Sequence, residues 1–248
     1  MEATNRVADS GDAPAAQARL RQAALEANLA IDGAGLVTLT FGNASAIDRA
    51  NGWLAIKPSG IPVAALTVED IVIVRIDDGQ QVAGATRPSS DTPTHLVLAR
   101  AFSGVGGIVH THSPAATAWA QAHRPIPCLG TSHADHFRGS VPVTRPLTAT
   151  EIADDYTAAT GRAIVEAFAE LDPDGVPAAL VRDHGAFTWG PDGPSAVANA
   201  IALELVARIA LDTLALAPDQ GPIAPELLER HHARKHGPRS TYGQGRPA

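Results

Sequence analysis

A strand that ends in two histidines constrains the fold of this chain more than any other segment. Residues 106–114 read Gly-Gly-Ile-Val-His-Thr-His-Ser-Pro. Side chains at positions i and i+2 of a strand point to the same face, so His110 and His112 can face a common point. Ser-Pro is a typical helix start, with serine as the N-cap and proline as the first helical residue. The segment therefore predicts a strand that leads directly into a helix, with two imidazoles at the junction.

The two histidines indicate a metal site, and two other residues can complete it. Imidazole nitrogens bind zinc at about 2.0–2.1 Å, and catalytic zinc usually has three protein ligands. His184 follows the apolar strand 178–181 and precedes a glycine, a position from which it can reach a cleft. Asp91, in a polar loop before a helix, could be a fourth ligand, a partner of a ligand, or only an N-cap. On spacing alone, histidines that only bond to the backbone remain an alternative.

Three loops combine small residues with hydroxyl or amide donors and exposed backbone N–H groups, and a lysine adds a positive charge. Such groups can bind the phosphate of a small substrate. Each loop alone is weak evidence, because serine and glycine are ordinary loop residues. The candidate phosphate-binding residues are Asn43, Lys57, Ser59, Gly60, Ser89 and Ser90.

Hydrophobic periodicity predicts interspersed helices and strands, joined by both hairpins and crossovers. We expect a single α/β domain, layered, with a central mixed or mainly antiparallel sheet flanked by helices. Residues 1–15 are expected to be a disordered extension, and 16–248 to form the domain. The predicted helices are 17–31, 94–102, 113–121, 148–169, 195–216 and 225–235, and the predicted strands are 36–41, 44–48, 53–57, 71–76, 107–112, 178–181 and 186–189.

Composition limits the partners of the protein. The chain has 248 residues, 45% of them hydrophobic, and a net charge of −7, which argues against a general nucleic-acid binder. Its one cysteine, Cys128, cannot form an internal disulfide. The most apolar helix, 195–216, carries Glu204, Arg208 and Asp212 along one face, so we expect no membrane span there. No secretory signal is visible, and a cytoplasmic location is expected.

Several segments in one order resemble a known family. The first is Leu-Val-Thr-Leu-Thr at 36–40 with Gly-Asn at 42–43, followed by Ile-Lys-Pro-Ser-Gly at 56–60 and Pro-Ser-Ser-Asp-Thr-Pro-Thr-His at 88–95. Further segments are 107–112, 133–135, 184–185, 189–190, 234–237 and 242–244. From about residue 20 to residue 244, the chain resembles the L-ribulose-5-phosphate 4-epimerases of the class II aldolase and adducin superfamily.

The resemblance implies an enzyme that interconverts L-ribulose 5-phosphate and D-xylulose 5-phosphate. It implies a class II aldolase-like fold, a homotetramer with active sites between subunits, and the phosphate site named above. It also implies bound Zn²⁺, or another divalent metal such as Mn²⁺ or Co²⁺. The implied metal ligands are His110, His112 and His184, with Asp91 close by. The residues that match positions entering from a neighbouring subunit are Asp135, His231 and Tyr242.

The implied chemistry requires a metal and two acid/base groups. Carbon 4 of the substrate carries no acidic hydrogen, but cleaving and re-forming the bond between carbons 3 and 4 can invert it. A Lewis acid stabilises the negative charge that cleavage leaves, and a proton must move on each side of the rotating aldehyde. We assign this to Asp135 and Tyr242, with His231 as an orienting group. Alternatively, Asp135 only pairs with Arg138, and Tyr242 is an unstructured tail residue.

Two other functions compete with this reading. A class II aldolase acting on fuculose or rhamnulose phosphate usually places a glutamate base where this chain has Asp91, and the shorter side chain favours the epimerase. A non-catalytic, adducin-like scaffold lacks the metal histidines that this chain has. The sequence also departs from the epimerase pattern: Arg-Asp at 182–183 replaces an expected His-Ser pair, and Thr157 stands where an acidic residue is expected.

Overall fold

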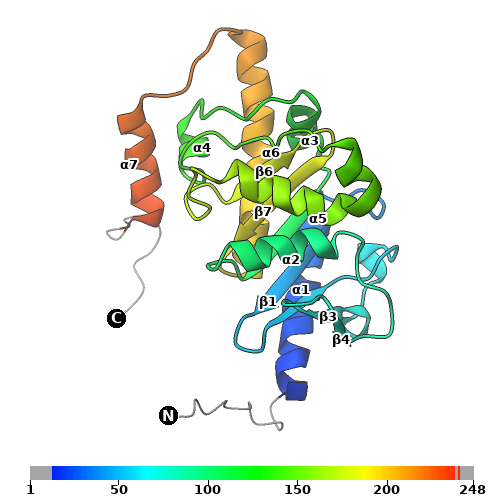
Figure 1. Ribbon diagram of the computed structural model, residues 1–248. Helices are drawn as coiled ribbons and strands as arrows, with labels where there is room; N and C mark the ends of the chain where they lie inside the picture. The colour runs from blue at the N-terminus through cyan, green and yellow to red at the C-terminus, as the bar shows by residue number, and fades with distance from the viewer. Residues whose placement is uncertain (1–12, 238–239, 241–248) are drawn as a thin grey trace, which may run out of the picture.

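A seven-stranded sheet forms the centre of the molecule (Figure 1). The computed structural model describes residues 13–237 and 240. Its strands follow the order β4-β3-β2-β1-β5-β7-β6, and each neighbouring pair is antiparallel. The predicted α/β class with a mainly antiparallel sheet is confirmed. The strands are β1 (Asn43–Asp48), β2 (Trp53–Ile56), β3 (Val72–Arg75), β4 (Gln81–Ala83), β5 (Gly107–Thr111), β6 (Ala178–Val181) and β7 (Gly185–Gly190).

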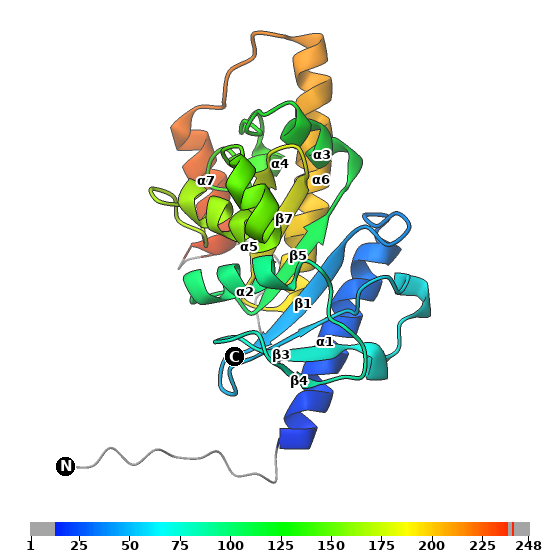
Figure 2. The ribbon, with the colours of Figure 1, turned by 45° about the vertical axis from the view of Figure 1, so that its right-hand side comes forward.

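Helices cover both faces of this sheet (Figures 1 and 2). On one face, Ile31 of α1 and Val197 of α6 pack around Val109 of β5. On the other, Leu98 of α2 packs in a larger core with Ile108. The α-helices are α1 (Ala13–Gly33), α2 (Thr92–Ala101), α3 (Pro114–Gln121), α4 (Thr131–Ala134), α5 (Ala149–Ala167), α6 (Gly193–Leu216) and α7 (Pro225–His236), and the 3₁₀ helices are η1 (Val63–Ala65) and η2 (Val68–Asp70).

The alternation of side chains along the strands explains the two-sided core. In β2, Leu54 and Ile56 belong to the core beneath α2, whereas Ala55 between them packs toward α1. Successive strand residues face opposite sides, so a slip of one residue would move both large side chains to the opposite face, into the space that Ala55 now fills. Burying a leucine or isoleucine contributes about 1.5–3 kcal/mol. The hydrophobic pattern therefore fixes the register on which the strand ends depend.

Side-chain caps mark the starts of two helices. Thr148 and Glu151 form the predicted capping box of α5, with both reciprocal bonds present. Asp192 caps α6, where its side chain accepts a hydrogen bond from the Ser195 N–H. α5 is not continuous, however: Asp155 has φ −157° and ψ 56°, values that interrupt the helix.

Three expectations differ from the structure. Residues 36–41 form no strand but a tight turn with a bridge between Thr38 and Phe41, in which Leu39 has a positive φ of 58°. The apolar pattern fails here because the chain reverses directly after α1 and exposes Leu39 to solvent. Helix α1 begins at Ala13, inside the segment expected to be disordered; residues 1–12 lie outside the described residues. Residues 131–134, which lie outside the predicted helices, form the short helix α4.

The centre of the sheet positions the candidate site. His110 at the end of β5 pairs in register with Asn43 of β1 on one side and with Phe187 of β7 on the other. Three segments that are far apart in the sequence therefore meet near one end of the central strands. Within the described residues, no helix combines the length and the apolar character needed to cross a membrane.

Candidate active site

The three predicted histidine ligands converge. His110, His112 and His184 each offer a ring nitrogen, and these atoms lie within 4.8 Å of one another. The Nε2 atoms of His110 and His112 are 3.1 Å apart. Ring centroids are separated by 4.8–4.9 Å, and the ring planes are inclined to one another by 65–73°. Three mutually inclined imidazoles with nitrogens this close form an arrangement that one cation can share.

Burial and hydrogen bonding prepare His110 as a ligand. Its ring is fully buried, stacks on Phe187 with centroids 4.2 Å apart, and its Nδ1 lies 2.9 Å from the Ala186 carbonyl oxygen. Burial lowers the pKa of His110 to about 3, so the ring is neutral at ordinary pH. A neutral imidazole that donates from Nδ1 presents a lone pair on Nε2. The donor set therefore fits a divalent cation without loss of a proton.

The other two rings are held from different elements. His112 stacks on Phe41 of the turn after α1, with centroids 5.6 Å apart. His184 follows Asp183, which has a positive φ of 62° and accepts a hydrogen bond from His123 at 2.5 Å. Burial lowers the pKa of His112 and also that of His184, whose neighbour His112 lowers it further. All three candidate ligands are thus favoured in the neutral, metal-binding form.

Asp91 lies beside the triad and is fixed by an amide. Its Oδ2 is 4.0 Å from His110 Nε2 and accepts a hydrogen bond of 2.7 Å from Asn43 Nδ2. Burial acts to raise the pKa of Asp91, but the neighbouring His110 and His95 and the Asn43 bond bring the net shift below the ordinary value. Asp91 precedes α2, but its side chain makes no capping bond there. Asp91 therefore occupies the N-cap position of α2 without capping the helix through its side chain.

The predicted phosphate residues line the same cavity as the triad. This cavity has a volume of about 330 Å³. Lys57 is 2% exposed, and burial lowers its pKa although Asp91 acts to raise it. Gly42 has a φ of 109°, and a Cβ there would lie 3.0 Å from the His110 carbonyl oxygen, so a side chain is disfavoured. The lining residues are Thr40, Phe41, Gly42, Asn43, Lys57, Ser59, Gly60, Ser89, Ser90, Asp91, His110, His112 and His184.

Asp135 and His231 lie together, but not in this cavity. His231 Nδ1 is 3.0 Å from Asp135 Oδ1, and Arg234 donates to both oxygens of Asp135 at 3.2 and 2.8 Å. Burial acts to raise the pKa of Asp135, but the bonds from Arg234 and His231 lower it overall. The alternative that Asp135 pairs with Arg138 is wrong, because Arg138 binds Glu229. Tyr242 lies outside the described residues.

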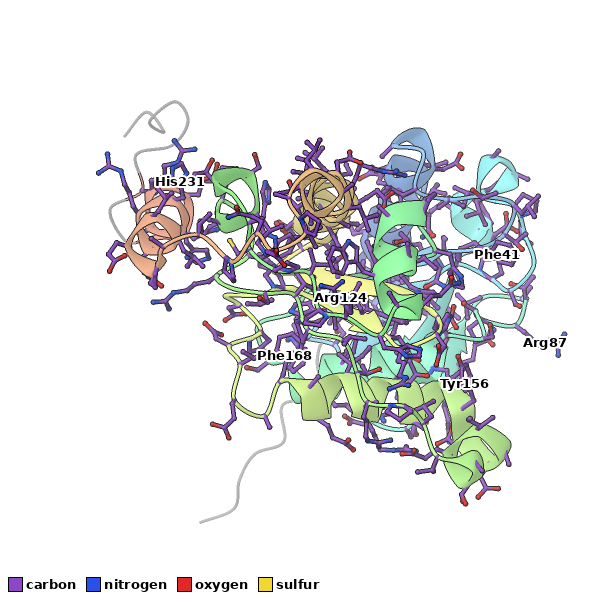
Figure 3. The ribbon with its side chains drawn as sticks, turned by 90° about the horizontal axis from the view of Figure 1, so that it is seen from above. Phe41, Arg87, Arg124, Tyr156, Phe168 and His231 are labelled. Atoms are coloured by element: carbon purple, nitrogen blue, oxygen red, sulfur yellow. The ribbon has the colours of Figure 1, made fainter. Side chains whose placement is uncertain are left out.

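Asp135 and His231 lie on the other side of the molecule from the histidine triad. Figure 3 shows His231 on the side opposite Phe41 and Tyr156. Asp135 lines a different cavity of about 390 Å³, between α4, α6 and Lys235 of α7. A single copy of the chain therefore does not bring Asp135 or His231 to the histidine triad.

A family model for the class II aldolase and adducin N-terminal domain matches residues 22–211, which includes the triad and the phosphate loops. The chain belongs to the class II aldolase and adducin family. The match ends before α7, so the helix that carries His231 lies outside the part of the chain that the family model matches.

Two Salmonella proteins resemble this chain over most of its length. It is 47% identical over 226 residues to "L-ribulose-5-phosphate 4-epimerase UlaF" of Salmonella paratyphi A, a match that covers 91% of this chain and 99% of the relative. The protein of that name in Salmonella typhi is also 47% identical over 226 residues, with the same coverage of both chains.

Solved structures share the fold of this family member. An L-fuculose 1-phosphate aldolase superposes with a TM-score of 0.74 at 24% identity, covering 87% of this chain and 95% of its own. An L-fuculose-1-phosphate aldolase from Thermus thermophilus gives a TM-score of 0.63 at 28% identity, covering 82% and 98%. The layered architecture is thus that of class II aldolases.

The sequence did not assign a role to two residues that contact the candidate ligands, or to a third that lies behind them. Phe41 stacks on His112, and Tyr156 Oη lies 3.2 Å from His184 Nδ1. His95 is fully buried, with Nδ1 2.8 Å from Ser45 Oγ. The sequence could have predicted the position of His95, because a residue one helical turn after Asp91 lies on the same side of the helix. Nothing in the sequence indicates the interruption of α5 that precedes Tyr156.

Proposed function

We propose that this class II aldolase family member is a metal-dependent L-ribulose-5-phosphate 4-epimerase. The observation that carries this proposal is one cavity lined by three neutral imidazoles and a set of anion-binding donors. The 47% identity to proteins named L-ribulose-5-phosphate 4-epimerase supports this choice among the activities of the family. The reaction interconverts L-ribulose 5-phosphate and D-xylulose 5-phosphate by cleaving and re-forming the bond between carbons 3 and 4.

The metal is proposed to be Zn²⁺, or another divalent ion such as Mn²⁺ or Co²⁺. His110, His112 and His184 would hold it, and Asp91 would be a further ligand or a hydrogen-bond partner beside it. When bound, such an ion supplies a Lewis acid for the sugar oxygens next to the cleaved bond. Three neutral nitrogens with one carboxylate nearby leave coordination positions for a substrate.

The phosphate is proposed to lie at the Lys57 end of the cavity. Lys57 is buried, and Nζ donates to the Pro58 carbonyl oxygen at 3.2 Å, which leaves further donor capacity for an anion. Loops 59–60 and 89–90 add hydroxyl and backbone donors. Asn43 uses its Nδ2 for Asp91, while its buried Oδ1 has no partner among the described residues and suits a substrate hydroxyl. A firm grip on the phosphate would retain the aldehyde fragment while it rotates.

Asp135 and Tyr242 are proposed as the acid/base pair, with His231 orienting Asp135. The bonds from Arg234 and His231 lower the pKa of Asp135 and keep it a carboxylate, which suits proton acceptance. Because Asp135 lies far from the triad within one chain, we place both groups in the cavity of a neighbouring copy. The proposed assembly is a homotetramer with active sites between subunits.

An exposed apolar stripe beside Asp135 supports that assembly. Ile201, Leu205 and Ile209 follow one another at intervals of four along α6 and are 44%, 55% and 43% exposed. Ile201 and Leu205 share a cavity with Asp135. Contiguous apolar surface of this kind usually marks a protein interface. We further propose a cytoplasmic location, which fits a phosphorylated sugar substrate and one buried, unpaired cysteine.

One assay tests the proposal. The metal-loaded protein is incubated with L-ribulose 5-phosphate, and both D-xylulose 5-phosphate and free glycolaldehyde phosphate are followed. We expect D-xylulose 5-phosphate to accumulate, and activity to disappear on chelation and return with added metal. Accumulation of dihydroxyacetone and glycolaldehyde phosphate without D-xylulose 5-phosphate would instead identify an aldolase. The fold shared with L-fuculose 1-phosphate aldolase makes that the second candidate.

A further inference from the structure

Helix α5 is interrupted one residue before Tyr156. Asp155 adopts φ −157° and ψ 56° within the helix, and its carboxylate pairs with Arg162 at 3.3 Å. On the other side, the Thr157 carbonyl oxygen accepts a hydrogen bond of 2.6 Å from Thr94 Oγ1 of α2. Non-helical conformations inside regular elements persist only where the surroundings hold them, and they cluster at functional sites. Because of this interruption, the direction of the Tyr156 side chain is not set by the first turn of α5.

Tyr156 contacts a candidate metal ligand from outside the cavity. Its Oη lies 3.2 Å from His184 Nδ1, and the two ring centroids are 6.0 Å apart. Thr160 donates to the Tyr156 carbonyl oxygen at 2.9 Å, which fixes the backbone below the ring. A neutral hydroxyl can accept a hydrogen bond from an imidazole N–H.

We propose that Tyr156 is a positioning residue that accepts the Nδ1–H of His184 and so commits the Nε2 lone pair of His184 to the metal. This inference rests on the metal centre proposed above. A neutral imidazole has one N–H and one lone pair, so a partner on one nitrogen selects the tautomer. Ligating histidines commonly have such a partner on the second nitrogen, which also fixes the orientation of the ring.

The comparison with His110 strengthens the assignment. Its Nδ1 has a backbone partner, the Ala186 carbonyl oxygen, at 2.9 Å. His184 lies on a loop between β6 and β7, and among the hydrogen bonds of the described residues the Tyr156 hydroxyl is the partner of its ring. Both ligands thus have a group on Nδ1, but only the partner of His184 is a side chain that can be removed by mutation.

The test removes one oxygen atom. Tyr156→Phe keeps the ring, and because the side chain is 41% exposed we expect the variant to fold. Co²⁺ affinity is measured by competition with a chelator, and the visible absorption of the Co²⁺ protein reports ligand geometry. We expect the Kd for Co²⁺ to rise about 10–100-fold and the absorption bands to shift. Thr213→Val is the matched control, since it removes a hydroxyl that bonds Ile209 on α6.

Nitrogen NMR of histidine-labelled, metal-free protein provides a second readout. We expect His184 to be protonated at Nδ1 in the wild type and to become a mixture of tautomers in Tyr156→Phe. Unchanged affinity and spectrum in a folded Tyr156→Phe protein would overturn the proposal, as would weakened affinity with an unchanged tautomer. A wild-type protein that binds no Co²⁺ would overturn the metal centre itself, a result distinct from failure of Tyr156 alone.

Discussion

The two groups of candidate catalytic residues are held in different ways. The triad stands at the end of β5 and directly before β7, two strands that each pair on both sides, and His110 is almost completely buried. Asp135 follows the four-residue helix α4, and its partners His231 and Arg234 belong to α7, a helix with no buried residue. Side chains that are locked by surrounding packing are held more precisely than side chains on an exposed helix. The first group therefore forms a complete site within one chain, whereas the second is the group for which we propose a role in a neighbouring copy.

The largest effect is expected from removing one member of the triad. His112→Ala deletes a ring nitrogen that lies 3.1 Å from His110 Nε2. Two remaining imidazoles should bind the ion too weakly to retain it, and epimerisation should fall by about four orders of magnitude or more. Elemental analysis should find about one divalent ion per wild-type chain and almost none in the variant. Normal metal content in a folded His112→Ala protein would contradict the assignment.

A smaller effect with retained metal is expected at the second group. Asp135→Asn keeps the shape of the side chain but removes the charge that Arg234 and His231 bind. If Asp135 moves a proton, activity should fall about 10²–10³-fold while metal content stays normal. Arg138→Gln is a suitable control, because it breaks a neighbouring exposed pair with Glu229 and leaves Asp135 untouched. Full activity of Asp135→Asn would remove this residue from the mechanism.

Mixing the two inactive variants tests whether the groups meet between copies. A site that takes its triad from one subunit and Asp135 from the next can be intact in a mixed oligomer. If His112→Ala and Asp135→Asn chains are unfolded, combined in equal amounts and reassembled, about a quarter of the sites should carry both wild-type groups. Recovered activity near that fraction would sharpen the comparison. No recovery in properly mixed oligomers would break it and require both groups to act within one chain.

The difference between the triad and the Asp135 group also explains which parts of the site the sequence could predict. The strand-turn-helix pattern around His110 and the apolar strand before His184 are local signals, and both residues were correctly brought to one site. The strand predicted at residues 36–41 is wrong because Leu39 takes a positive φ, which the β-branched pattern of this segment does not reveal. The contact of Tyr156 with His184 depends on the interruption at Asp155, a product of tertiary packing against α2. A role between subunits, as proposed for Asp135 and His231, has no local signal in the sequence of one chain, so only the family resemblance suggested it.

The smallest predicted effect is on the pH dependence of stability, to which one buried histidine from each region contributes. His95, beneath the triad, and His133, in α4, are both buried, and burial lowers the pKa of each to about 4. An unfolded histidine has a pKa of about 6.5. Between these values the unfolded state binds more protons, so the folded state loses stability as the pH falls from about 6.5 toward 4. Above that window the contribution is complete.

His133→Gln isolates one of these protons. His133 Nε2 lies 2.7 Å from the Gly139 carbonyl oxygen, and glutamine retains an N–H that can donate to the same acceptor. Each such histidine steepens the fall in unfolding free energy by about 1.4 kcal/mol per pH unit within the window. Chemical denaturation of metal-free protein at several pH values should therefore give a slope that is shallower by about this amount in the variant. The contribution of His95 to the slope should persist in the same experiment, because its ring packs against Phe187, whereas the ring of His133 packs against Phe137. An unchanged slope in His133→Gln would mean that His133 is already protonated in the folded state, and that the α4 region is more open to water than the cavity of the triad.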